Sequence, residues 1–123
     1  MVNNSRQIFG QRAEAAAAGF LSSRGYTILE QNYTTRYGEI DIVASHEDTL
    51  VFIEVKARRG LRHGGPKEAV NAPKQQKIIG TATHYLKQHG IHDTRIRFDV
   101  VAMLEENGQF SFELIPNAFQ VNG

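Results

Sequence analysis

Residues 37–58 constrain the fold more than any other stretch of the chain, because two apolar, β-branched segments there flank a short polar one. The polar segment is Ser45-His46-Glu47-Asp48-Thr49, and the pattern predicts two strands joined by a tight turn. Burial of one apolar face would fix the register, and that face carries Ile40, Ile42, Val51, Ile53 and Val55. The other face carries Val43 and Phe52. Both faces therefore need cover, which predicts an α/β fold with helices on both sides of the sheet.

The same hairpin brings charged side chains together. A turn centred on the polar segment places Asp41 opposite Glu54, and Glu39 opposite Lys56. Like charges directly opposite one another destabilise a sheet, and a divalent cation between them would remove the repulsion. Oxygen ligands on neighbouring strands favour Mg²⁺ or Mn²⁺, and Lys56 could then orient a water molecule or offset charge in a transition state. The alternative is a set of ordinary surface ion pairs.

Composition bounds the class of protein. The chain has 123 residues, which suits one domain with a hydrophobic core, and we expect a single domain with tails at residues 1–4 and 117–123. We expect a soluble, cytoplasmic protein, because there is no long apolar segment and the first residues lack the apolar core of a signal peptide. Because the chain has no cysteine, any metal must be held by oxygen or histidine ligands.

The first predicted helix covers residues 5–24. Its apolar residues recur at helical spacing, and Gly25 stands where a helix commonly ends. Glu14 is the one acidic residue within it. Taken alone, an exposed glutamate partnered by a nearby arginine such as Arg12 is the simpler interpretation.

The second predicted helix covers residues 74–89, with Pro73 at its start and Gly90 after its end. The expected buried stripe consists of Ile78, Ile79, Ala82 and Leu86, and a neighbouring face carries Lys77, Thr81 and Tyr85. Besides the central hairpin, strands are predicted at residues 26–33, 95–103 and 109–115, the last two joined by the hairpin turn Asn107-Gly108.

The net charge is only +1, but the charge is unevenly placed. Between residues 55 and 77, seven basic residues stand against the single acidic Glu68. A basic segment directly after a carboxylate cluster suits a polyanion whose phosphates approach a bound metal, although a solvated basic loop is the alternative. The residues that we expect to contact nucleic acid are Arg58, Arg59, Arg62, Lys67, Lys74 and Lys77.

Glu39-Ile40-Asp41, followed by Glu54-Val55-Lys56, resembles the core signature of the PD-(D/E)xK nuclease superfamily, with Ile40 in place of the proline that names it. More closely, the chain resembles the YraN-type bacterial family, usually described as predicted endonucleases. The residues that carry this resemblance are Gly10-x-Arg12-Ala13-Glu14, Asn32, Gly38 to Asp41, Val51 to Arg58, Lys77, Arg97-Phe98-Asp99-Val100-Val101 and Asn117-Ala118-Phe119.

The resemblance implies a three-layer α/β/α, restriction-endonuclease-like fold with a mixed five-stranded central sheet, similar to archaeal Holliday junction resolvases. It also implies that Glu14 joins Asp41 and Glu54 as a metal ligand and that all three are catalytic. Lys56 is then the catalytic lysine, and a water molecule activated by Mg²⁺ or Mn²⁺ is the nucleophile.

Two further carboxylates are accessory candidates. Glu39 either positions Lys56 or binds the metal directly. Asp99 either supports the site or forms a salt bridge with Arg97 or Arg95.

The sequence thus favours a metal-dependent endonuclease that hydrolyses phosphodiester bonds of DNA, either duplex or branched. A second hypothesis is a nucleic-acid-binding module of the same fold with little or no cleavage, acting with a partner in repair, recombination or uptake. A third is a structural domain without a ligand. Junction-resolving relatives act as symmetric dimers, so a homodimer is left open by analogy of fold.

Overall fold

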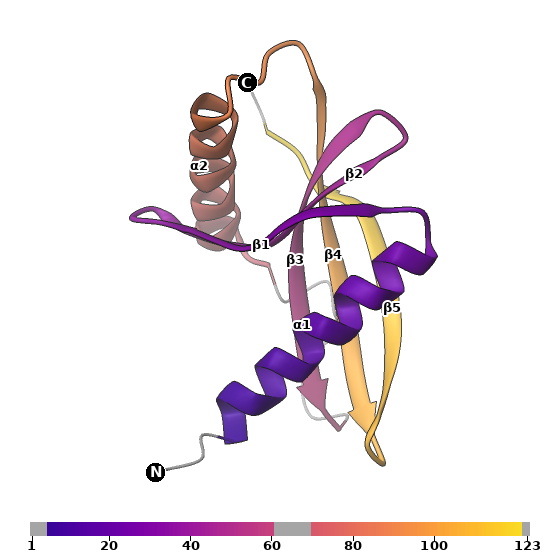
Figure 1. The fold of residues 1–123 in the computed structure, drawn as a ribbon. Coiled ribbons are helices and arrows are strands. Elements are labelled where there is room, and N and C mark those ends of the chain that lie inside the picture. The colour runs from indigo at the N-terminus through magenta and orange to yellow at the C-terminus, as the bar shows by residue number, and fades with distance from the viewer. Residues whose placement is uncertain (1–4, 61–69, 122–123) are drawn as a thin grey trace.

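The computed structural model describes residues 5–60 and 70–121 of the chain. Within these two ranges, two helices and five strands follow one another in the order that Figure 1 shows. They are α1 (Ser5–Ser23), β1 (Thr27–Thr35), β2 (Gly38–His46), β3 (Thr49–Arg59), α2 (Ala72–Gln88), β4 (Arg95–Glu106) and β5 (Gln109–Phe119).

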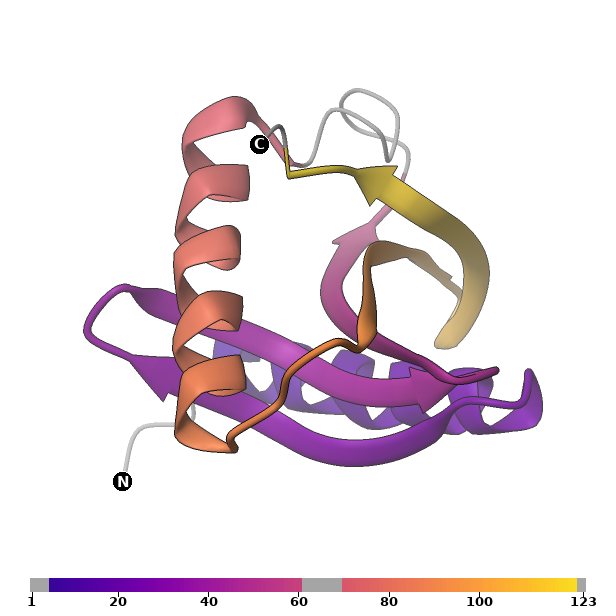
Figure 2. The same cartoon turned by 90° about the horizontal axis from the view of Figure 1, so that it is seen from above.

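The strands form one mixed sheet in the order β1-β2-β3-β4-β5. Only β3 and β4 pair in parallel, and the other neighbours are antiparallel. The parallel pair needs a long crossover, which contains α2. In Figure 2 the sheet is strongly twisted, and α1 and α2 lie on different sides of it. The predicted α/β fold, with helices packed on a mixed five-stranded sheet, is confirmed.

Each helix covers its own hydrophobic core. The α1-side core consists of Ala13, Ala17, Leu21, Tyr26, Ile42, Ala44, Val51, Ile53, Val101 and Met103. The α2-side core consists of Tyr33, Ile40, Val43, Leu50, Phe52, Ile78, Ala82, Tyr85, Phe98 and Phe119. Side chains of β2 and β3 enter both cores, so the central hairpin is buried on its two faces as predicted.

α1 ends as the sequence predicts. Gly25 adopts a left-handed conformation with φ of 90°, and its N–H donates to the Ser22 carbonyl at 3.2 Å. The next N–H, of Tyr26, donates to the Leu21 carbonyl at 3.0 Å. These two bonds make a Schellman motif, which satisfies the last carbonyls of the helix. Leu21 and Tyr26 both lie in the α1-side core and fix the direction in which the chain enters β1.

The central hairpin has the predicted register close to its turn. Glu47 and Asp48 both have positive φ, as in a two-residue type I′ turn, and the pairs run from His46 with Thr49 to Ile42 with Ile53.

Beyond Ile42 the prediction is wrong. Ile40 packs in the α2-side core, whereas Ile42 packs in the α1-side core, so the strict alternation of side chains is broken between them. The pairing of β2 with β3 also ends at Ile42 with Ile53, and the expected pair of Glu39 with Lys56 is not part of it. The strands therefore diverge at the residues that carry the carboxylates.

α2 begins where the sequence predicts, but it buries a different face. The side chain of Asn71 caps it by accepting a 3.0 Å hydrogen bond from the Lys74 N–H, and Pro73 lies in the first turn. Thr81 and Tyr85, expected beside the buried stripe, are buried themselves. The Thr81 hydroxyl can be buried because it donates to the carbonyl of Lys77 at 2.8 Å. The buried residues are Ile78, Thr81, Ala82 and Tyr85, while Ile79 and Leu86 are only partly buried.

The two C-terminal strands are longer than predicted. β4 continues to Glu106, and Asn107 and Gly108 form the expected turn with positive φ. β5 continues to Phe119, which pairs with Phe98, so residues 117–119 are strand rather than the tail that we expected. Neither helix in the described ranges is long and apolar enough to cross a membrane.

Candidate metal centre

Three carboxylates from two elements come together at one side of the sheet. Glu14 comes from the middle of α1, and Glu39 and Asp41 come from the start of β2. Each offers a carboxylate oxygen, and these oxygens all lie within 4.8 Å of one another. Because Ile40 points into the α2-side core, its two neighbours in the strand project toward α1 and meet Glu14. We call this group the acidic cluster.

Asp41 is held at the point where β2 and β3 diverge. Its Oδ2 accepts a hydrogen bond of 2.7 Å from the backbone N–H of Val55. In β1, Asn32 lies opposite Asp41, between the pairs of Gln31 with Ile42 and Tyr33 with Ile40. Asn32 has a φ of 55°, which is uncommon for a residue within a strand, and its side chain acts on Glu14, whose pKa it lowers against the larger effect of burial. Such strain often marks functional sites.

Among the described residues, the positive charge of Lys74 lowers the pKa of Glu39 and of Asp41, but it does not outweigh the effects that raise them. Burial and the neighbouring Glu54 raise the pKa of Asp41 to about 8. Burial, and next the charge of Asp41, raise the pKa of Glu14 and of Glu39. The raised pKa values show that the folded protein disfavours three negative charges here. Three carboxylate oxygens at this spacing could hold a metal ion, which would offset that repulsion.

Glu54 adjoins the acidic cluster but faces α2. Its neighbours in β3, Ile53 and Val55, contact the α1-side core, so Glu54 projects toward the other face. It is only 8% exposed, it raises the pKa of the neighbouring Asp41, and its Oε1 lies 3.6 Å from Nζ of Lys74 in α2. Glu54 is therefore next to Asp41, as the sequence indicated. Its role as a metal ligand stays a prediction.

Lys56 lies beside Lys74 as well as Glu54. Burial and the charge of Lys74 lower the pKa of Lys56, and Glu54 opposes this shift. Glu39, which we considered as a partner that positions Lys56, lies in the acidic cluster instead. Lys74 was expected only to contact phosphates, yet it lies among the site residues. The sequence gives no sign of this, because it depends on how the start of α2 docks over β3.

Two arginines, Arg59 of the predicted basic segment and Arg12 of α1, both pair with Glu105. Arg59 pairs with Glu105 at 3.5 Å and its guanidinium covers the ring of Phe9 at 4.4 Å. Arg12 also binds Glu105, at 2.8 Å, rather than Glu14, so the expected neutralisation of Glu14 by Arg12 is not found.

Among the other predicted nucleic-acid contacts, Arg58 is partly buried and its charge contributes to the lowered pKa of Lys56. Lys77 is exposed on α2, one turn after Lys74. Arg62 and Lys67 lie outside the described residues.

Asp99 belongs to a separate buried network. Arg97 donates to both of its carboxylate oxygens, at 2.8 and 2.9 Å. The Tyr26 hydroxyl donates at 2.8 Å and the Asn117 N–H at 2.9 Å. The salt bridge with Arg97 that we considered for Asp99 is therefore present. Four donors occupy this carboxylate, and the acidic cluster does not include it.

Proteins of one family are similar to this chain over most of its length. A family model described as "Uncharacterised protein family UPF0102" matches residues 13–103, which include the acidic cluster. A UPF0102 protein of Desulforapulum autotrophicum is 54% identical over 121 residues, 98% of this chain and 100% of its own. One of Desulfosudis oleivorans is 47% identical over 119 residues, 97% and 95% of the two chains. One of Clostridium botulinum is 44% identical over 115 residues, 91% and 94% of the two chains.

Proposed function

The chain belongs to the uncharacterised protein family UPF0102, and we propose that it is a metal-dependent endonuclease of DNA, with the restriction-endonuclease-like fold of the PD-(D/E)xK superfamily. The observation that carries the proposal is the acidic cluster. A helix and a strand there bring together three carboxylates, whose oxygens lie within 4.8 Å of one another. The mutual repulsion of these carboxylates favours the binding of a cation between them. A cation held there would attract the negatively charged oxygens of a phosphodiester.

In this proposal Glu14, Glu39 and Asp41 hold Mg²⁺ or Mn²⁺, with Glu54 as the candidate further ligand. The cation supplies Lewis acidity toward a phosphoryl oxygen and lowers the pKa of a water molecule. Asp41 is also fixed by its bond to the Val55 N–H, so its carboxylate is already oriented when a substrate arrives.

The lysines supply the remaining chemistry. Lys56 Nζ, whose pKa is lowered, is suited to donate a hydrogen bond or a proton to an oxygen of the reacting phosphate. Lys74 Nζ offsets the charge of Glu54 on the same side of the sheet. In this proposal Lys77, which is exposed on α2 one turn after Lys74, contacts a neighbouring phosphate.

The test is a cleavage assay with Mn²⁺ on single-stranded, duplex, flap and four-way-junction DNA of shared sequence. The native protein should cut at least one of these substrates. Asp41→Asn and Lys56→Met should each reduce the rate by about 100-fold or more, a typical loss for groups that act on the reacting atoms. Glu113→Gln, an exposed carboxylate on β5, is the matched control and should cut normally.

Cleavage that survives both Asp41→Asn and Lys56→Met would come from a contaminant and would remove these residues from the mechanism. Binding without cleavage on every substrate would instead favour the binding module.

A further inference from the structure

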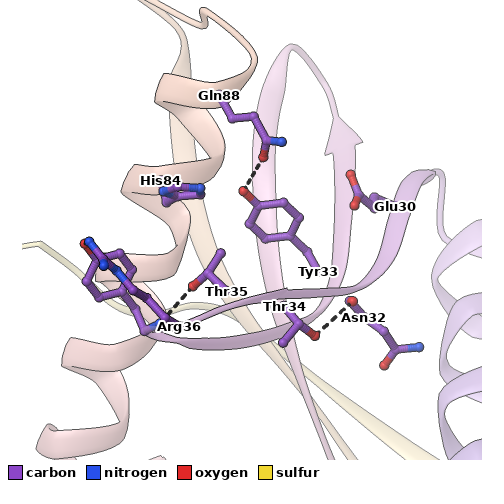
Figure 3. Close-up of a pocket in the computed structure, with 9 residues that line it drawn as sticks. Glu30, Asn32, Tyr33, Thr34, Thr35, Arg36, His84 and Gln88 are labelled. Carbon is purple, nitrogen blue, oxygen red and sulfur yellow. Dashed lines mark hydrogen bonds between the residues drawn. The ribbon is translucent and has the colours of Figure 1, made fainter.

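A pocket of about 700 Å³ lies between β1, the turn after it and the second half of α2 (Figure 3). Its wall includes the rings of Tyr33, Tyr37 and His84. His84 stands between the two tyrosines, with its ring centre 6.4 Å from that of Tyr33 and 6.2 Å from that of Tyr37. The volume is within the usual range for small-molecule sites.

One side of the pocket is rigid and the other is open. Tyr33 is buried, and its hydroxyl donates a 2.6 Å hydrogen bond to Oε1 of Gln88, which Figure 3 also shows. Its ring also meets that of Tyr85 edge-on at 5.1 Å. Tyr37 is 49% exposed and His84 is exposed as well. The exposed rings therefore offer flat faces to a ligand beside a fixed wall.

The pocket and the acidic cluster are linked through side chains of β1. Asn32 and Thr34 line the pocket from β1, and their side chains interact with Glu14 and Glu39 respectively. In Figure 3 the Asn32 side chain points away from His84 and Gln88, so this strand serves both sites. A ligand that reached the acidic cluster with one group could place an adjacent group in the pocket.

The chemistry of the wall selects a planar and largely uncharged group. Arg36 and Glu30 both line the pocket, so it has no strong charge of one sign. The Arg36 guanidinium lies over the ring of Tyr37 at 5.1 Å and donates to its hydroxyl at 3.1 Å, which holds this ring in place. Exposed aromatic faces with amide and hydroxyl groups nearby are typical of sites that stack a nucleobase.

We propose that this pocket binds an unpaired nucleobase of the nucleic acid whose phosphate lies at the acidic cluster. The proposal rests on the proposed function, and it narrows the substrate to nucleic acid with an unpaired nucleotide next to the reacting phosphate. A base inside a duplex is stacked and paired and would not reach the pocket.

The test is equilibrium binding in EDTA, followed by fluorescence anisotropy, to labelled oligothymidylate and to a duplex of equal length. Tyr37→Ala and His84→Ala should each weaken binding to oligothymidylate, by about 10-fold for Tyr37→Ala, as expected for loss of one stacked base. Tyr37→Phe keeps the ring, with the Arg36 guanidinium over it, and should bind far more tightly than Tyr37→Ala does. Leu29→Ala removes an exposed apolar side chain of β1 outside the pocket and is the matched control. Affinity for the duplex should not change in any of these variants.

The proposal is overturned if Tyr37→Ala and His84→Ala bind oligothymidylate like the native protein, or if they lose duplex binding to the same extent. Because EDTA removes divalent metal, the outcome does not depend on cleavage. A protein that binds through the pocket and cuts nothing would retain this inference and lose the nuclease proposal. If the native protein cuts DNA but Tyr37→Ala binds oligothymidylate as tightly as the native protein does, the nuclease proposal is retained and this inference is lost.

Discussion

The carboxylate of Asp41 accepts a 2.7 Å hydrogen bond from the backbone N–H of Val55, just beyond the last antiparallel pair of β2 with β3. The Asp41 side chain therefore accepts a hydrogen bond from a backbone N–H that the carbonyl of a neighbouring strand accepts elsewhere in the sheet. The sheet can therefore open between these strands without leaving a buried donor unpaired. The opening is the place where Asp41 meets Glu14 of α1.

This double role of Asp41 predicts different effects for two substitutions. In the metal-free protein, Asp41→Asn keeps an oxygen for the Val55 N–H and removes only the ionisable group. Asp41→Ala removes the ionisable group and the acceptor together. We expect the alanine variant to be less stable than the asparagine variant by about 1–3 kcal/mol, the cost of an unsatisfied buried donor. Urea denaturation in EDTA measures the difference, and equal stabilities would show that the bond to Val55 contributes nothing.

The stability of the metal-free protein should fall as the pH rises from about 4 to about 8. The pKa of Asp41 is about 8 in the folded protein against an ordinary value of 3.8, so between these values the folded state binds a proton that the unfolded state has released. Stability then decreases with pH, by at most about 1.4 kcal/mol per pH unit for one proton. Denaturation in EDTA at several pH values tests this. Asp41→Asn should show a shallower slope, and an identical slope in both proteins would contradict the assignment.

The part of the site that lies near the hairpin turn was predictable. A two-residue turn leaves few choices of register, and burial of alternate residues such as Val51 and Ile53 rejects the others. The same logic placed Asp41 next to Glu54. Glu14 could be added only by resemblance, because an exposed-looking glutamate on a helix has no local signal of a distant partner.

The rest depends on three-dimensional packing that a strand pattern does not encode. A strict alternation puts Ile40 on the face of Ile42, yet the two enter different cores. That break turns Glu39 toward α1 and into the acidic cluster. The burial of Thr81 could not be predicted from the pattern of apolar residues. Its polar hydroxyl can be buried because it donates a hydrogen bond to a carbonyl of the same helix. The position of Lys74 follows from the same docking of α2.

Asp99 should affect stability far more than metal binding. It is 1% exposed and its carboxylate receives four hydrogen bonds, two of them from Arg97. Asp99→Ala would leave that guanidinium beside an empty space, and we expect a loss of about 3–5 kcal/mol in the free energy of unfolding. Tyr26→Phe removes one of the four bonds to the carboxylate and also the 3.0 Å bond that the Tyr26 hydroxyl accepts from Arg97, and it should cost about 1–3 kcal/mol. A small effect of Asp99→Ala in urea denaturation would contradict a structural role for this network.

Lys77 and Arg59 should differ in their effect on DNA binding, although both were predicted from sequence as phosphate contacts. Arg59 is engaged by Glu105 and Phe9, whereas Lys77 is exposed on α2 near the site. We expect Lys77→Ala to lower DNA affinity and to reduce the slope of log affinity against log salt by about 1. Arg59→Ala should leave the slope unchanged. A reduced slope in Arg59→Ala together with an unchanged slope in Lys77→Ala would place the DNA over α1 rather than α2.

The most direct test of the central claim is a titration of the native protein with Mn²⁺, in which electron paramagnetic resonance follows the free ion. We predict saturable binding to the native protein that weakens as the pH falls below neutral, because protons compete for the same carboxylates. Binding should be lost in Asp41→Asn and in Glu14→Gln, and retained in Glu113→Gln. Saturable binding that is equal in all four proteins, or none in the native protein, would contradict the acidic cluster as a metal centre.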